Sequence, residues 1–320
     1  MRILCSILLA AGLTTSSCHR DTSLGDATTS SPDAAASGAA ASAGGSGEAG
    51  GGQSAGGSGP SQVNDCAPSP HSCGFPDATN TGLPPGTQLS PAAACEITTD
   101  GAVVDATDFA CTVTIRARDV LIRRSKIHPG SGGAIRVMSG NVSLEDCELY
   151  DATDVVIQYD NWSCLRCDIH DFQDDGARLG NDTRLEDSFI HGFITPQGSA
   201  AEGAQLQAGV ARVVVRHSTI FANDQSGAAP ATAALFIAPD QGPTSDGPVV
   251  LEGNLLAGGQ YTVYVVDGNQ GQFVIKNVSL KNNRFVRDSA RYGPLSLTDS
   301  EKPFLSSGGN VWDRDGTPIE

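Results

Sequence analysis

The sequence predicts an all-β protein: a single-stranded parallel β-helix, or solenoid, that follows a disordered N-terminal linker. Between residues 120 and 286 one phrase recurs, in which an alternating strand is followed by a small or polar residue and then an aliphatic one. Each repeat carries a second short alternating strand, and Gly, Asn and Asp separate the strands. Apolar residues nowhere recur at helical spacing between capping residues. Short strands that repeat without intervening helices are typical of a solenoid.

The repeats align on one small or polar residue in each coil: Ser125, Cys147, Cys167, Ser188, Ser218, Asn254 and Asn283. Successive anchors are 22, 20, 21, 30, 36 and 29 residues apart. A basic period with loop-sized excesses indicates insertions at one corner of the solenoid. Two residues beyond each anchor stands an apolar side chain that we expect to stack inward, namely Ile127, Leu149, Ile169, Ile190, Ile220, Leu256 and Phe285.

Residues 1–18 are predicted to be a signal peptide. Arg2 precedes a short apolar run, Ile3 to Leu13, that is too short to span a bilayer as a mature helix. The following Thr15-Ser-Ser-Cys18 resembles a bacterial lipobox, although it lacks the Leu preferred three residues before the cysteine. Cys18 is therefore the candidate for lipidation, with simple secretion as the alternative.

Residues 19–64 are predicted to be a disordered linker, because the segment is almost wholly Ala, Gly, Ser, Thr and Asp and contains no aromatic residue. This leaves 65–320 for the β-helix, with 65–111 as its N-terminal cap. We expect an exported monomer that touches a membrane only through its lipid anchor, at the outer membrane or cell surface. The 36 acidic and 20 basic residues give a net charge of −16, which argues against nucleic acid as a partner.

Cysteine usage suits an oxidising compartment. Short separations favour two disulfides, Cys66–Cys73 and Cys95–Cys111. Three further cysteines leave one thiol unpaired. Cys147 and Cys167 occupy equivalent positions one coil apart, so they are the preferred third pair, with Cys164 facing inward.

Equivalent positions in neighbouring coils of a β-helix lie about 4.8 Å apart. The alignment places Asp154, Asp175 and Glu202 in one column at the head of the second strand, where three carboxylates repel unless a cation or an arginine lies nearby. Calcium prefers such oxygen ligands, so these acids are the candidate Ca²⁺ site. Two further columns are expected: Arg136, Ile157, Arg178 and Gln205 beside the acids, and His128, Tyr150, His170 and His191 at the end of the first strand.

Three segments carry a family resemblance: Gly74-Phe-Pro-Asp-Ala-Thr-Asn-Thr-Gly-Leu-Pro-Pro-Gly-Thr-Gln-Leu89, Leu255-Leu-Ala-Gly-Gly-Gln-Tyr-Thr-Val-Tyr264 and Gly309-Asn-Val-Trp-Asp313. They resemble phrases of secreted bacterial proteins, mostly uncharacterised, in the pectin-lyase-like superfamily. The resemblance covers residues 73–320. It implies a right-handed parallel β-helix and a polysaccharide-associated protein of the bacterial exterior.

In lyases of that superfamily, calcium on carboxylates binds an acidic sugar and a basic side chain removes the C5 proton. The resemblance therefore makes Arg178 and His170 candidate bases, with His191 in the same histidine column. Gln205, Gln207, Tyr264 and Asp240 are the expected contacts to the sugar. Related proteins often carry His-x-Asp-Gly-Ile-Gln where this chain has Ala200-Ala-Glu-Gly-Ala-Gln205, so that histidine is missing.

Two classes of function stay open. The first is a carbohydrate-active enzyme at the cell surface: a calcium-assisted lyase on an acidic, uronate-containing polysaccharide, with a hydrolase or an epimerase ranked behind it. The second is a glycan-binding or structural surface lipoprotein without turnover. In that alternative the histidines cap the corners of the coils and the acids belong to their turns.

Overall fold

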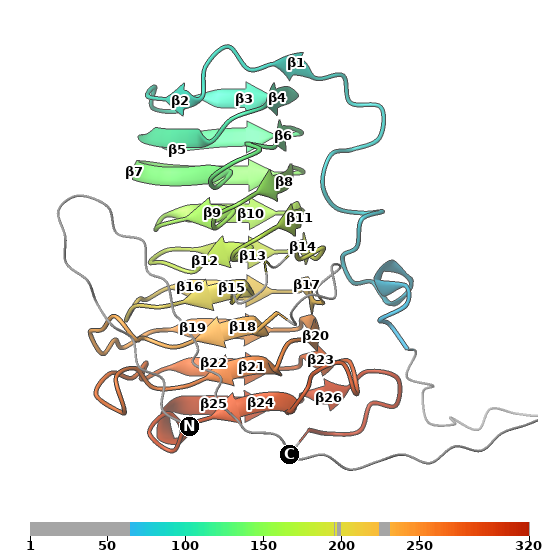
Figure 1. Ribbon diagram of the computed structural model, residues 1–320, viewed down its shortest axis with the longest axis vertical. Helices are drawn as coiled ribbons and strands as arrows, with labels where there is room; N and C mark the ends of the chain where they lie inside the picture. The colour runs from blue at the N-terminus through green and yellow to red at the C-terminus, as the bar shows by residue number, and fades with distance from the viewer. Residues whose placement is uncertain (1–64, 195, 197–199, 224–230, 320) are drawn as a thin grey trace, which may run out of the picture. The chain divides into compact units, whose positions relative to one another are not determined.

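The protein folds as a right-handed parallel β-helix, which confirms the predicted fold class (Figure 1). The computed structural model describes residues 65–194, 196, 200–223 and 231–319. The predicted signal peptide, Cys18 and the linker to residue 64 lie outside the described residues. Each coil contributes up to three short strands, and every strand pairs in parallel with its counterparts in the neighbouring coils. The coils therefore stack into three faces.

Face 1 contains β2 (Glu96–Ile97), the first parts of β5 (Val113–Arg123) and β7 (Ile135–Glu145), β9 (Ile157–Gln158), β12 (Ala177–Arg178), β15 (Glu202–Leu206), β18 (Ala233–Ile237), β21 (Tyr261–Val265) and β24 (Gly293–Leu297). Face 2 contains β3 (Val103–Asp105), the second parts of β5 and β7, β10 (Trp162–Leu165), β13 (Arg184–Glu186), β16 (Val213–Arg216), β19 (Val249–Glu252), β22 (Val278–Lys281) and β25 (Leu305–Gly308). Since β5 and β7 run through both, these two faces form one 16-stranded sheet.

Face 3 is a separate 10-stranded sheet. It contains β1 (Ser90–Pro91), β4 (Thr107–Phe109), β6 (Lys126–Ile127), β8 (Glu148–Ala152), β11 (Asp168–Phe172), β14 (Phe189–Ile190), β17 (Thr219–Ala222), β20 (Leu255–Gly258), β23 (Arg284–Phe285) and β26 (Val311–Trp312). Two short 3₁₀ helices complete the described chain, η1 (Pro70–Cys73) and η2 (Lys302–Phe304).

Stacked apolar side chains fill the interior. The predicted inward column is confirmed: Ile127 pairs with Leu149, Leu149 with Ile169, and the column continues through paired residues to Phe285. All seven of its members are at most 1% exposed. Because every layer repeats the one below, short β-branched side chains suffice to close a core that has few aromatic rings.

The segment 65–89 lies alongside the coils rather than over their end (Figure 1). The backbone N–H groups of Cys66 and Ala67 donate to the Asp313 carboxylate of the last coil, at 2.8 and 2.9 Å. Further along, the Gly82 N–H donates to the carbonyl of Arg166 at 2.9 Å. Only the later part of the predicted cap, from β1 onward, lies at the N-terminal end of the solenoid.

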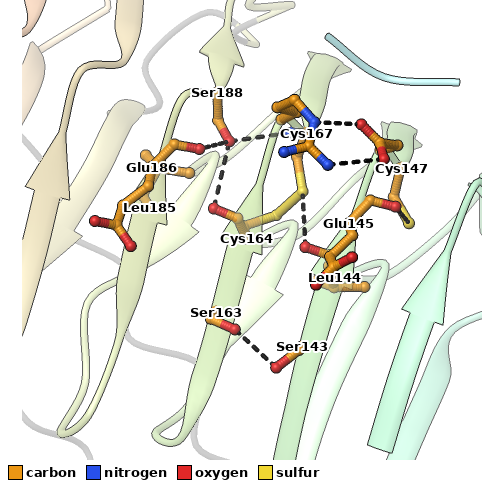
Figure 2. The surroundings of a disulfide bond; sticks show 12 residues. Ser143, Leu144, Glu145, Cys147, Ser163, Cys164, Cys167, Leu185, Glu186 and Ser188 are labelled. Carbon is orange, nitrogen blue, oxygen red and sulfur yellow. Dashed lines mark hydrogen bonds and ion pairs between the residues drawn. A yellow bond between two sulfur atoms is a disulfide. The ribbon is translucent and has the colours of Figure 1, made fainter. Parts of the chain in front are cut away.

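Two of the predicted disulfides form, Cys66–Cys73 and Cys95–Cys111, but the third pair was wrong. Cys167 bonds to Cys164, whose Cα lies 5.9 Å away across the corner between β10 and β11 (Figure 2). Cys147 is buried and unbonded, and its thiol donates to the carbonyls of Ile122 and Glu145. Burial raises the pKa of that thiol to about 12.

A buried polar ladder joins the anchor positions of the repeat. In four successive coils the side-chain oxygen of one anchor accepts the backbone N–H of the anchor one coil earlier, at 2.9–3.2 Å: Ser188 to Ser218, Ser218 to Asn254, Asn254 to Asn283, and Asn283 to Asn310. The amide groups of Asn254, Asn283 and Asn310 also donate to strand carbonyls at 2.8–3.0 Å. The ladder thus satisfies backbone groups that each corner would otherwise bury without partners.

Replacing Asn283 with alanine tests the ladder. Asn283→Ala leaves the Asn254 backbone N–H and side-chain amide without the oxygen that accepts both of them, at 3.0 and 2.9 Å. We expect the free energy of unfolding to fall by about 2–4 kcal/mol, measured by urea denaturation. The control Ser279→Ala, on the outer surface of β22, should change it by less than about 0.5 kcal/mol. Equal stability of the two variants would contradict the ladder's role.

Candidate functional site

One outward column of face 1 runs through seven coils. Its members follow from the strand register, in the order Arg136, Gln158, Arg178, Gln205, Phe236, Tyr264 and Ser296. The predicted place of Ile157 in this column was wrong, because Ile157 pairs with Ala177 and points into the core. Polar side chains therefore occupy the first half of the column and aromatic rings the second half.

The same register separates the predicted acidic column. Since Ile157 pairs with Ala177 and Ala177 with Ala204, Asp154 is level with Asp174, whereas Asp175 is level with Glu202. Asp154 instead forms an ion pair with Arg136, with 3.1 Å between Oδ2 and Nη2. The prediction that Asp154, Asp175 and Glu202 share one column was wrong by one residue.

Asp175 and Glu202 form a buried carboxyl pair at the corner that leads from face 3 into face 1. Asp175 is 1% exposed and Glu202 4%. Asp175 accepts the Glu202 backbone N–H at 3.1 Å and a hydrogen bond from Arg178 Nη2 at 2.7 Å. Gly176 and Gly203 allow this close approach, because a Cβ on Gly176 would lie 2.6 Å from the Gly203 carbonyl oxygen.

Burial and the negative charge of Asp175 raise the pKa of Glu202 well above its ordinary value. The Glu202 carboxyl therefore keeps its proton and hydrogen-bonds to Asp175. Arg178 balances the charge of Asp175 and also donates to Gln207, which accepts from Gln241 as well. The network therefore places the negative charge of Asp175 beside the protonated carboxyl of Glu202.

Asp174 is the accessible acid of the cluster. Its side chain is partly exposed, and burial together with the charge of Asp175 raises its pKa to about 7. The charge of Asp154 in the preceding coil contributes to the same shift. Asp154 and Asp174 are level with one another in adjacent coils, so the carboxylate of Asp154 stands beside a carboxyl that is about half protonated at pH 7.

Calcium does not fit this arrangement. The carboxylates of Asp154 and Asp175 are each paired with an arginine, and Asp154 lies one residue out of register with Asp175 and Glu202, so the three predicted ligands do not form one column. Within residues 65–319, as far as the structure describes them, no group of three His, Cys, Asp or Glu side chains could hold a metal ion. Arginine and a retained proton relieve the repulsion that the sequence assigned to Ca²⁺.

The predicted histidine column forms on face 3. The rings of His128, Tyr150, His170 and His191 stack with centroids 5.1, 5.2 and 5.3 Å apart. Each histidine pairs with acids of its own sheet or the turn beyond it: His128 with Asp108, His170 with Glu148 and Asp171, and His191 with Asp168. Although burial opposes it, the Glu148 hydrogen bond and the charges of Asp168 and Asp171 raise the pKa of His170.

The predicted catalytic set is therefore divided between two sheets. Arg178 lies with the acids of face 1, whereas His170 lies on β11 of face 3 and His191 directly follows β14 of the same face. A guanidinium stays charged in proteins, so Arg178 positions Asp175 through their ion pair and does not act as a base. Of the residues expected to contact the sugar, Gln205 and Tyr264 lie on strands of face 1, and Gln207 directly follows β15. Asp240 stands beyond the end of β18, where burial and the nearby Asp267 raise its pKa.

Sequence reasoning missed a cluster of aromatic rings that continues the column. Phe236 and Tyr264 have ring centroids 4.8 Å apart, Tyr264 and Tyr261 5.4 Å, and Tyr261 and Tyr292 5.5 Å. The two tyrosines of β21, Tyr261 and Tyr264, were a sequence signal for this cluster. Tyr292 gave none, because it precedes β24 in a coil that the repeat alignment did not reach.

Comparisons with known proteins assign no family to this chain. No family model and no curated protein matches the chain. A solved structure, the alginate lyase from Paenibacillus sp. str. FPU-7, is similar at 13% identity over 72% of this chain and 89% of that chain, with a TM-score of 0.37. That similarity is too distant to support an argument about the site. In the part of the chain that the structure describes, no helix has the length and apolar character needed to cross a membrane.

The raised pKa values predict how stability depends on pH. Asp174 and Glu202 keep their protons in the folded state at pH values where the unfolded chain releases them, so the free energy of unfolding should fall as pH rises from about 4 through about 7. For Asp174 alone the shift from 3.8 to about 7 corresponds to a loss of about 4 kcal/mol over this range, of which about 3 kcal/mol falls above pH 5. Urea denaturation at about pH 5 and about pH 8 measures it. Asp174→Asn should flatten the pH dependence.

The exposed control Asp246→Asn, whose carboxylate pairs with Lys276 at the surface, should keep the pH dependence of the unsubstituted protein. Equal stability of the unsubstituted protein at both pH values would show that these carboxyls do not retain their protons.

Proposed function

We propose that this protein cleaves a polysaccharide by hydrolysis on face 1, with Asp174 as the general acid and Asp154 as the ionised carboxylate beside it. The observation that supports this is a partly exposed acid with a pKa of about 7, level with an ionised acid in the adjacent coil. Glycosidases use such a pair: the neutral carboxyl protonates the leaving oxygen, and the carboxylate activates water or attacks the sugar.

The remaining residues of the cluster support that division of roles. Asp175 is too buried to reach a sugar, but its charge adds to the burial of Asp174 in raising the pKa of Asp174. Arg178 and Glu202 fix Asp175 in place. The Nε atoms of Arg136 and Arg178 are buried without a hydrogen-bond partner. Buried donors without a partner are rare in structural networks and are typical of functional sites.

A lyase acting on a uronate polymer is the second candidate. The side chains of Arg136 and Arg178 are 38% and 28% exposed, so their charges could face a sugar carboxylate without calcium. The proton of the sugar would then pass to Asp154, because Arg178 stays charged. The two reactions differ in their products: hydrolysis gives only new reducing ends, whereas elimination also gives an unsaturated sugar that absorbs ultraviolet light.

Replacing Asp174 tests the proposal. Asp174→Asn and Asp154→Asn should each lower the rate of cleavage about 10²–10⁴-fold, measured as new reducing ends on a panel of neutral and uronate polysaccharides. The unsubstituted enzyme should lose activity as pH rises through about 7, where Asp174 loses its proton. Asp246→Asn serves as the control and should cleave at the unsubstituted rate.

Three results would count against hydrolysis. Full activity of Asp174→Asn removes the proposed acid. Ultraviolet absorbance in the products assigns the chain to the lyases. Retained binding of a polymer with no turnover assigns it to the glycan-binding proteins.

We also propose that the chain is exported and anchored at the cell surface through a lipid on Cys18. The disulfides Cys66–Cys73, Cys95–Cys111 and Cys164–Cys167 support export, because such bonds persist in oxidising compartments. In a bacterial host, radiolabelled palmitate should enter the unsubstituted protein and not Cys18→Ser, while the control Cys5→Ser should be labelled. Labelling of Cys18→Ser would exclude the anchor.

A further inference from the structure

A pocket of about 220 Å³ lies at the last coils, on the corner that leads from face 3 into face 1. Its walls come from β21, from the turn between β23 and β24, and from β26, and include Thr262, Asp288, Arg291, Tyr292, Gly293 and Trp312. Tyr292 is 55% exposed. This opening presents aromatic surface to solvent at the last coils of the solenoid.

Two charged side chains of the pocket, Arg291 and Asp288, lack an ion-pair partner in the described part of the chain. The guanidinium of Arg291 lies over the Tyr292 ring, 5.1 Å from its centroid. Among the residues that the structure describes, neither Arg291 nor Asp288 has an ion pair or a side-chain hydrogen bond. A free donor and a free acceptor thus border an exposed aromatic ring. A pyranose ring matches this set, since its C–H face stacks on an aromatic ring and its hydroxyl groups both donate and accept.

The pocket lies in the same column of face 1 as Glu202 of the acid cluster. Glu202 pairs with Ala233, Ala233 is level with Tyr261, and Tyr261 pairs with Gly293 in the wall of the pocket. Asp174 lies one coil before Glu202, so it is four coils from the pocket, about 19 Å at the usual spacing of neighbouring strands. The aromatic rings of Phe236, Tyr264 and Tyr261 occupy the coils between and lead to Tyr292.

We propose that the pocket is a remote subsite that holds a pyranose ring of the same polysaccharide chain whose linkage lies at Asp154 and Asp174. The inference rests on the proposed function for the cleavage site. The chain then crosses the coils along the N-terminal ends of the face 1 strands, over the aromatic rings. Tyr292 stacks on the sugar, Arg291 donates to it and Asp288 accepts from it. Oligosaccharides too short to reach from the acids to the pocket lose these contacts.

Binding as a function of chain length tests the subsite. Oligogalacturonates and cello-oligosaccharides of increasing length are titrated into the full chain by calorimetry. The emission of Trp312 gives a second readout, because the other tryptophan, Trp162, is 1% exposed. We expect affinity to rise once an oligomer spans both sites. Tyr292→Ala should weaken the long oligomers about tenfold, the loss of one aromatic contact, and leave the short ones unchanged.

Arg291→Gln should act in the same direction, whereas the matched control Arg118→Gln, an exposed arginine at the opposite end of the solenoid, should bind like the unsubstituted protein. If Tyr292→Ala and Arg291→Gln bind every length unchanged while Asp174→Asn abolishes cleavage, the subsite is wrong and the hydrolase stands. If no substrate is cleaved but the length dependence disappears in Tyr292→Ala, the hydrolase is wrong and the subsite stands. Failure of every oligomer to bind overturns the subsite.

Discussion

The hydrogen-bonded register between neighbouring coils is the constraint on which the rest of this structure depends. Every side chain of a coil stands about 4.8 Å from its counterparts above and below, so a shift of one residue carries a group into a different column. The buried ladder from Ser188 through Asn283 helps to hold that register at the corner between faces 2 and 3, where the backbone leaves one sheet and enters the next.

The acid cluster shows how the register creates chemistry. One residue fewer between Asp154 and the next acidic turn brings Asp154 level with Asp174 and leaves Asp175 to turn inward beside Glu202. The inward pair is neutralised by Arg178 and a retained proton, and its remaining field acts on Asp174 at the surface. The raised pKa of Asp174 therefore comes first from its own burial and then from the charge of Asp175 beside it.

Much of this fold could be predicted from the sequence, because each coil repeats the same pattern of apolar and polar residues. The anchors, the inward column to Phe285 and the ring stack from His128 to His191 all lie where the alignment placed them. The prediction was wrong where side-chain direction within a corner decides. Cys167 turns toward Cys164 in its own coil rather than toward Cys147 one coil earlier. The register of Asp154 was readable from the 20-residue spacing of Cys147 and Cys167, which brings Asp154 level with Asp174, but the alignment of the second strands matched Asp154 with Asp175 by residue type.

The charge of the whole chain gives a poor guide to the charge that a substrate meets on face 1. The net charge of −16 would repel a uronate polymer at long range. Along the strip that carries the site, however, Arg136 balances Asp154 and Arg178 balances Asp175, while the pKa of Glu202 is raised well above its ordinary value and that of Asp174 is raised to about 7. The strip is then close to neutral, and its far end is aromatic. Contact along it therefore selects for sugar rings by stacking and hydrogen bonding, and a carboxylate on the sugar is neither required nor excluded by the local charge.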